Sequence, residues 1–227
     1  MCVAGYLRKC IRGLWFQLKG ISVFALVPIL GLYGLLPLMN YLAYRFQDVS
    51  GMSNMLYDNI LRMSQYFIPL LSVWWILFVL EHYVEEPSHE LLYLDYRLKL
   101  GELLLLYVGF LMLMVPLFVV YTRIFPTFWW LFLKLAVLNL FYLASAYCAA
   151  YISGKLLPAI LLVLFYTLYV IAESATGFTE HHLLPLGEMI GPEFLEGMAV
   201  YILLALVLLI IGGIANYLYP ERGGGPD

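Results

Sequence analysis

Charged residues are scarce in this chain of 227 residues, because only 12% are Asp, Glu, Lys or Arg whereas 64% are hydrophobic. A water-soluble domain of this length could not bury so much apolar surface. The low charge therefore indicates that lipid surrounds most of the chain. The shortage of basic residues also excludes the positively charged surface that nucleic-acid binding requires.

Cysteine is rare too: Cys2, Cys10 and Cys148 are the three in the chain, and no two form a C-x-x-C pair. An odd number without that spacing argues against a disulfide framework or a zinc site. The adjacent His181 and His182 do not fit the H-E-x-x-H pattern, so no metal site is predicted. The sequence also lacks a G-x-x-x-x-G-K-[ST] loop, so we expect no bound cofactor and no ATP site in this chain.

Long runs without charge are abundant. A helix needs about 20 residues to cross the hydrocarbon core, and the runs reach or approach that length. The period-two alternation of a membrane β-barrel is absent. We therefore predict an all-α integral membrane protein, a single domain over 1–227, with six transmembrane helices at 20–44, 63–84, 102–122, 128–152, 156–173 and 197–219.

Lysine and arginine give the direction of these spans, because cytoplasmic segments carry more of both. The outer segments would contain Arg45, Arg62 and Arg123, with Lys134 near the outer end of its span and extending to the headgroups. We expect a multi-pass protein of the plasma (cytoplasmic) membrane with both termini in the cytoplasm. The inner segments would then contain Arg8, Lys9, Arg12, Lys19, Arg97, Lys99, Lys155 and Arg222.

Residues 5–19 have an apolar stripe at helical spacing, and the basic side chains fall on another face. This pattern predicts an amphipathic interface helix along the inner headgroups before the first span. A general membrane anchor and a helix that also contacts a partner protein both fit it. The stripe consists of Leu7, Ile11, Leu14 and Leu18.

Residues 87–100, between the second and third spans, carry helix signals in a polar segment. Pro87 ends the preceding span, Ser88 is a favourable N-cap, and Glu90 lies in the first turn, where the helix dipole favours an acid. The pattern predicts a short helix with its apolar side toward the bundle and its charged side toward the cytosol. Its apolar stripe is Leu91, Leu94 and Leu98.

The segment 174–196 is too long and too apolar for a simple turn, and Gly and Pro interrupt it. Two short re-entrant helices in the outer leaflet fit this composition if the bundle shields their backbone. Its acids, Glu188 among them, indicate a hydrated acidic outer mouth.

Asn139 and Ser145 lie at membrane depth in the fourth span. Polar residues at that depth mark a transport pathway or join neighbouring helices, and the sequence leaves both open. We name Asn139, Ser145 and Glu188 as a possible translocation path.

Three of these features resemble the ABC transporter type-2 (exporter-class) permease family. That family has an interface helix before its first span, a cytoplasmic coupling helix between spans two and three, and two re-entrant helices between spans five and six. The corresponding stretches here are "LRKCIRGLWFQLK", then "EHYVEEPSHELLYLDYRLKLGE", which begins at Glu81 and contains "SHELL", and residues 174–196. The usual Gly-Thr before E-L-L is replaced by Ser-His, which would fit a divergent branch.

The resemblance implies export of an amphiphilic cargo, such as a peptide, a lipid-linked glycan or a drug. It implies a nucleotide-binding ATPase subunit that holds ATP and Mg, and a second permease subunit, identical or related. This chain would then be a transporter subunit with no catalytic residues of its own. The coupling helix would contact the ATPase through Glu85, Glu86, His89, Glu90, Leu91, Leu94, Asp95 and Arg97.

Two other classes remain open. An intramembrane enzyme needs converging acid, base or metal-binding residues at membrane depth, and Glu81 with His82 is the one serious acid–base pair. A non-catalytic module, such as a substrate-capturing importer subunit, would suit the size and the span count. The segment 87–100 distinguishes such a module from an ATP-driven permease, because a substrate-capturing subunit does not need an amphipathic helix there.

Overall fold

The structure is a computed structural model that describes residues 11, 23–45, 52–84, 97–176 and 192–218. All elements in these ranges are helices, which confirms the all-α prediction for the described part of the chain. They are η1 (Phe24–Leu26), α2 (Val27–Leu30), η2 (Gly31–Leu35), α3 (Leu36–Arg45), α4 (Met52–Val84), α6 (Arg97–Ile124), α7 (Phe128–Ser153), α8 (Leu156–Thr176) and α9 (Pro192–Leu218).

Among the described residues, five helices are long and apolar enough to cross a membrane, so the chain is a multi-pass membrane protein. The apolar part of α8, Leu156–Tyr169, is shorter than these five helices. The five candidate spans are Phe24–Leu42, Leu56–Val84, Lys99–Ile124, Phe128–Ser153 and Gly197–Leu218.

The outside of the bundle is covered with large apolar side chains. Phe165 on α8 is 66% exposed, and Leu203 on α9 is 67% exposed. Neither is isolated, because α8 and α9 each present several more such residues to the surroundings. Patches of this extent are compatible with lipid but not with water.

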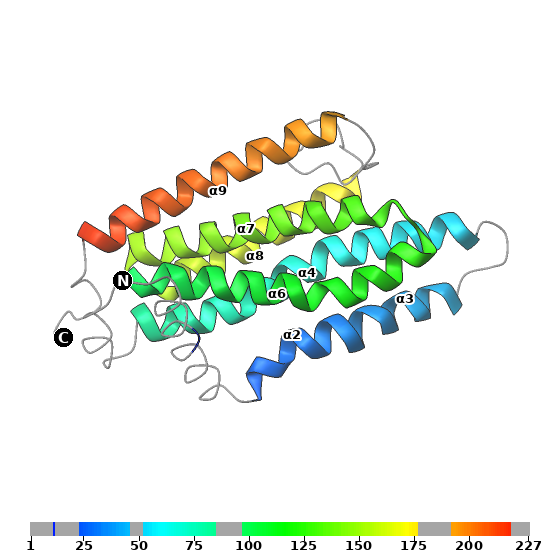
Figure 1. Ribbon diagram of the computed structural model, residues 1–227, viewed down its shortest axis with the longest axis horizontal. Coiled ribbons are helices and arrows are strands. Elements are labelled where there is room, and N and C mark those ends of the chain that lie inside the picture. The colour runs from blue at the N-terminus through cyan, green and yellow to red at the C-terminus, as the bar shows by residue number, and fades with distance from the viewer. Residues whose placement is uncertain (1–10, 12–22, 46–51, 85–96, 177–191, 219–227) are drawn as a thin grey trace.

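The centre of the bundle is α7, which contacts α4, α6, α8 and α9. Its buried residues lie on all sides, as expected for a helix surrounded by others. Figure 1 shows the helices lying roughly side by side, with α9 along one edge and α2 and α3 along the opposite edge. The α9 helix packs mainly on α7, and this contact is close because Gly212 lies against Tyr147.

The first span is one helical rod made of η1, α2, η2 and α3, and it packs on α4. The indole nitrogens of Trp74 and Trp75 on α4 donate hydrogen bonds to the carbonyls of Phe24 and Ala25, at 3.0 and 2.9 Å. These carbonyls lie at the start of the rod, where its hydrogen bonding is 3₁₀ in character. The two tryptophans therefore fix where the first span begins relative to α4.

The ends of the helices alternate between two ends of the bundle. Figure 1 places the ends of α4 and α9 and the start of α6 together, and we call this the Val84 end. The turn from α7 to α8 belongs to it as well, and Gly154 closes that turn with a left-handed φ of 66°. Arg45, Met52 and the α6–α7 turn define the other end, which we call the Arg45 end.

Several boundaries differ from the sequence prediction. The second helix begins at Met52 instead of residue 63, because Asp58 and Arg62, whose charges indicated a loop, lie on exposed positions of α4. The third begins at Arg97, so the last residues of the predicted coupling helix 87–100 belong to α6.

The remaining predicted segments fall largely outside the described residues. The interface helix 5–19 is described only at Ile11, which is helical. The outer segment 174–196 is described only at its margins, where α8 continues to Thr176 and α9 begins at Pro192.

The position of the Lys134 side chain also differs from the sequence prediction. Its side chain is 4% exposed, so it points into the bundle instead of extending to the headgroups. Ionisable groups inside membrane helices usually face the bundle interior, where other protein groups surround them.

Candidate functional site

A cluster of buried charged and aromatic side chains lies at the Val84 end. Lys99, near the start of α6, is 1% exposed. Its ammonium lies 5.3 Å from the ring centre of Tyr83 on α4 and 5.8 Å from that of Tyr151 on α7. Both distances are within the range of a cation–π contact, so Lys99 joins the three helices.

Glu102 is the acid of this cluster. It lies one turn after Lys99 on α6, is buried, and accepts a hydrogen bond from the Tyr83 hydroxyl. Tyr83 thus presents its ring to the ammonium and its hydroxyl to the carboxylate. Hydrogen bonds to ionised groups are stronger than neutral ones, so this contact holds the end of α4 against the start of α6.

The position of the cluster matters because the segment 85–96 leaves α4 after Val84 and enters α6 at Arg97. Tyr83 lies just before that segment and Lys99 lies just after it. The two residues contact each other, and Lys99 also contacts Tyr151 on α7. A displacement of the segment would therefore reach the central helix through the cluster.

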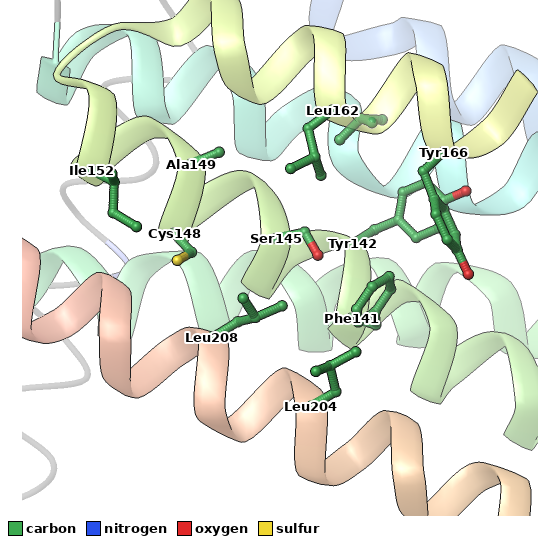
Figure 2. Close-up of a pocket in the computed structure, with 11 residues that line it drawn as sticks. Phe141, Tyr142, Ser145, Cys148, Ala149, Ile152, Leu162, Tyr166, Leu204 and Leu208 are labelled. Atoms are coloured by element: carbon green, nitrogen blue, oxygen red, sulfur yellow. The ribbon is translucent and has the colours of Figure 1, made fainter. Parts of the chain in front are cut away.

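An apolar cleft of about 410 Å³ lies between α7, α8 and α9 (Figure 2). The floor is α7, because it contacts both of the other helices. This volume is within the range that ligand sites occupy, roughly 300 to 1,000 Å³. Its lining includes Ser145 and Cys148 from α7, Leu162 and Tyr166 from α8, and Leu204 and Leu208 from α9.

The hydroxyls of the two tyrosines that line the cleft, Tyr142 and Tyr166, each have a partner. The hydroxyls of Tyr142 and Thr167 lie 3.0 Å apart, and Thr167 donates to the Val163 carbonyl at 2.8 Å. The Tyr166 and Tyr201 hydroxyls lie 3.4 Å apart. The cleft therefore offers an almost wholly apolar surface, which suits a hydrocarbon chain or an aromatic group.

The two predicted path residues in α7 have different surroundings. Ser145 lines the cleft, and Figure 2 shows it between Tyr142 and Cys148. Asn139 does not line it. Asn139 is 0% exposed, and its amide nitrogen contacts the Met114 sulfur on α6 at 3.4 Å, which fits the interpretation of Asn139 as a contact between helices.

Two further polar residues at membrane depth were missed by the sequence analysis. Ser64 and Gln65 on α4 are buried, and neither the Ser64 hydroxyl nor the Gln65 amide has a hydrogen-bond partner among the described residues. The Asn139 carbonyl oxygen lacks one there as well. Their place within a long helix of charge-free residues could have indicated them, since polar residues are few at that depth.

A polar contact at the Arg45 end was also missed. Asn40 on α3 donates to the Tyr121 hydroxyl on α6 at 3.0 Å, and Asn59 on α4 donates to the Asn40 side-chain oxygen at 2.9 Å. This chain of hydrogen bonds joins three helices. No sequence spacing indicates it, because the residues come from three different helices.

Most predicted contact residues lie outside the described part of the chain: Glu188 of the path, and Glu85, Glu86, His89, Glu90, Leu91, Leu94 and Asp95 of the coupling helix. Arg97 is the first residue of α6, and its side chain is not among those described. Within the described ranges, no group of three or more His, Cys, Asp or Glu side chains could hold a metal ion. His181 and His182 are outside these ranges.

Comparisons of this chain with protein-family models, with curated proteins and with solved structures found no match.

Proposed function

We propose that this chain is the transmembrane permease subunit of an ATP-driven exporter, and that a separate nucleotide-binding subunit supplies the energy. Its cargo is amphiphilic: a peptide, a lipid-linked glycan or a drug. The observation that carries the proposal is the buried contact of Lys99 with Tyr83 and Tyr151, which lies directly beside the segment that the ATPase would move.

The route for the motion begins at residues 85–96. This segment follows Tyr83 and precedes Lys99. Tyr83 contacts Lys99, and Lys99 contacts Tyr151 near the Val84 end of α7. The same helix carries Ser145 and Cys148 in the floor of the apolar cleft. A rigid displacement of α7 would therefore change the cleft, and domain motions of this kind underlie many switching transitions.

The cleft supports an amphiphilic cargo. It lies among helices whose outer faces are apolar, and the hydroxyls of its two tyrosines have hydrogen-bond partners. A cargo with a hydrocarbon or aromatic part could enter it from the lipid without passing through water.

In this proposal α8 is a sixth span. It runs for 21 residues, which is about 32 Å at 1.5 Å per residue, close to the hydrocarbon thickness of about 30 Å. Six spans return the chain to its starting side, so both termini and the segment 85–96 face the cytoplasm. A second permease subunit, identical or related, would complete the transport path, and the membrane would be the plasma membrane.

The test is the affinity purification of the tagged full chain from its native membrane. The expected result is a stable complex with a P-loop ATPase and ATP hydrolysis by that complex. The double variant Leu91→Asp with Leu94→Asp should insert normally but lose the hydrolysis, because it removes the apolar stripe of the coupling helix. The conservative pair Leu91→Met with Leu94→Met should retain it. A complex without any nucleotide-binding subunit would refute the proposal.

A further inference from the structure

A second apolar recess lies between α4 and α8 and encloses about 530 Å³. Its walls are side chains from one face of each helix, among them Leu70, Trp74 and Leu77 of α4 and Leu156 and Leu164 of α8. Trp74 presents an apolar wall, because its indole nitrogen already donates to the Phe24 carbonyl at 3.0 Å. We call this recess the α4–α8 groove.

The groove has the length of one leaflet. The helix α4 rises about 16 Å between Leu70 and Glu81, and half of the hydrocarbon core is about 15 Å thick. Glu81 lies close to the end of α4 at Val84, and Leu156 is the first residue of α8. The groove therefore extends from the membrane surface at the Val84 end to the middle of the bilayer.

One lining residue is charged. Glu81 is half-buried, and its carboxylate forms no hydrogen bond or ion pair anywhere in the described part of the chain. Lys155 directly precedes Leu156, is exposed, and likewise has no ion pair there. The Glu81 carboxylate thus lies at the mouth of the groove, and Lys155 directly precedes the first lining residue of α8. The two side chains do not form an ion pair with each other.

We propose that the α4–α8 groove binds one acyl chain of a phosphatidylethanolamine molecule from the leaflet at the Val84 end. The ammonium of the headgroup binds Glu81, and its phosphate binds Lys155. A primary ammonium has three N–H donors for a carboxylate, and such charge-assisted hydrogen bonds are among the stronger ones. The methylated ammonium of phosphatidylcholine lacks these donors, and phosphatidylglycerol has no cation for Glu81.

This site goes beyond the proposed function, since binding of a lipid needs neither ATP nor a partner subunit. The groove would hold a structural lipid against α4 and α8, while the cleft on α7 receives the cargo. Failure of one assignment leaves the other intact, because the lipid is measured on the isolated chain and the export function on the complex.

The experiment is native mass spectrometry of the purified full chain in a nonionic detergent. Phosphatidylethanolamine, phosphatidylcholine and phosphatidylglycerol with identical acyl chains are titrated separately. We expect phosphatidylethanolamine to bind about tenfold more tightly than phosphatidylglycerol, which corresponds to about 1.4 kcal/mol. Binding of phosphatidylcholine should lie between the two.

Glu81→Gln keeps the size of the side chain and removes its charge, so it should abolish the preference among the three lipids. Asp58→Asn is the matched control, because Asp58 is an exposed acid on the same helix at the Arg45 end. It should leave the preference unchanged. Ile160→Trp should fill the groove and reduce binding of all three lipids, with the unfolding temperature measured beside it to show that the chain remains folded.

Two results would overturn the proposal. Equal binding of the three lipids by the unaltered chain would show that the headgroup is not recognised. A preference that survives Glu81→Gln would show that this carboxylate does not provide the recognition, whatever Ile160→Trp does.

Discussion

The ammonium of Lys99 lies 5.3 Å from the centre of the Tyr83 ring, although the segment 85–96 separates the two residues along the chain. Lys99 is almost fully buried, and a desolvated contact of this kind is worth about 2 kcal/mol. The contact between these two residues therefore holds the two helix ends on either side of that segment together. Any force on the segment acts on a junction between α4 and α6 that is already fixed to α7.

Tyr83→Phe tests the acid of this junction. The variant keeps the ring beside Lys99 but removes the hydroxyl that donates a hydrogen bond to Glu102. We therefore expect the free energy of unfolding to fall by about 1.5 to 3 kcal/mol. Tyr107→Phe is the comparison, because the Tyr107 hydroxyl donates to the neutral Ala136 carbonyl at 3.0 Å, and its loss should cost only about 0.5 to 1.5 kcal/mol. Thermal unfolding in detergent measures both. Equal losses of stability in the two variants would show that the hydrogen bond to Glu102 is no stronger than one to a neutral carbonyl.

Gly212 and Gly213 form a matched pair on α9. A methyl group on Gly212 would come within 2.6 Å of the Tyr147 ring and 3.1 Å of the Cys148 Cα atom, whereas one on Gly213 meets nothing within 4 Å. Gly212→Ala should therefore destabilise the bundle by about 1 to 3 kcal/mol through overpacking. Gly213→Ala should stabilise it by up to about 1 kcal/mol through helix propensity.

The unfolding temperatures of the two glycine variants check this prediction. The contact of α9 with α7 is the main one that α9 makes. A Gly212→Ala protein as stable as the unaltered chain would mean that α9 lies farther from α7 than the structure places it.

Cys148 reports on the cleft between α7, α8 and α9. With Cys2 and Cys10 replaced by Ser, the apolar reagent N-ethylmaleimide should label Cys148 in membranes slowly, because the reagent can enter the apolar cleft but the reactive thiolate is disfavoured there. A cationic methanethiosulfonate should label it far more slowly. Ser145→Phe should slow labelling by N-ethylmaleimide, since the ring fills the space beside the thiol. If Ser145→Phe leaves the labelling rate unchanged, Ser145 and Cys148 do not line the same cleft.

The orientation is tested by labelling single cysteines in a chain without native cysteine. A membrane-impermeant maleimide should label Ser50→Cys in intact cells. It should label Ser88→Cys only after the membrane is permeabilised, because the excess of Lys and Arg predicts that this segment faces the cytoplasm. The reverse pattern would contradict the prediction that residues 87–100 face the cytoplasm as a coupling helix.

The existence of the helices was predictable because a charge-free run of sufficient length has few alternatives in lipid. Their boundaries were less predictable. Asp58 and Arg62 indicated a loop, yet a helix continues through them with both side chains exposed. Charge shows where a side chain meets a polar surface, but it does not show whether the backbone there is still helical.

The direction in which a polar side chain points was hardest to predict. Lys134 was expected at the headgroups and is buried, because which face of α7 is covered depends on helices far away in sequence. Lys99, Tyr83 and Tyr151 come together for the same reason. Spacing within one helix reveals neighbours at i+3 and i+4 only, whereas this cluster joins three helices.

Contact between the segment 85–96 and an ATPase subunit is tested most directly with a photo-crosslinking amino acid at position 89, in place of His89, in cells that express the whole complex. If the proposed function is right, a light-dependent adduct with a P-loop ATPase subunit forms. The same crosslinker at Ile124, which is exposed at the other end of α6, should give none. If position 89 forms no adduct with a nucleotide-binding protein, or if both positions form the same adduct, ATP does not drive this bundle through the segment 85–96.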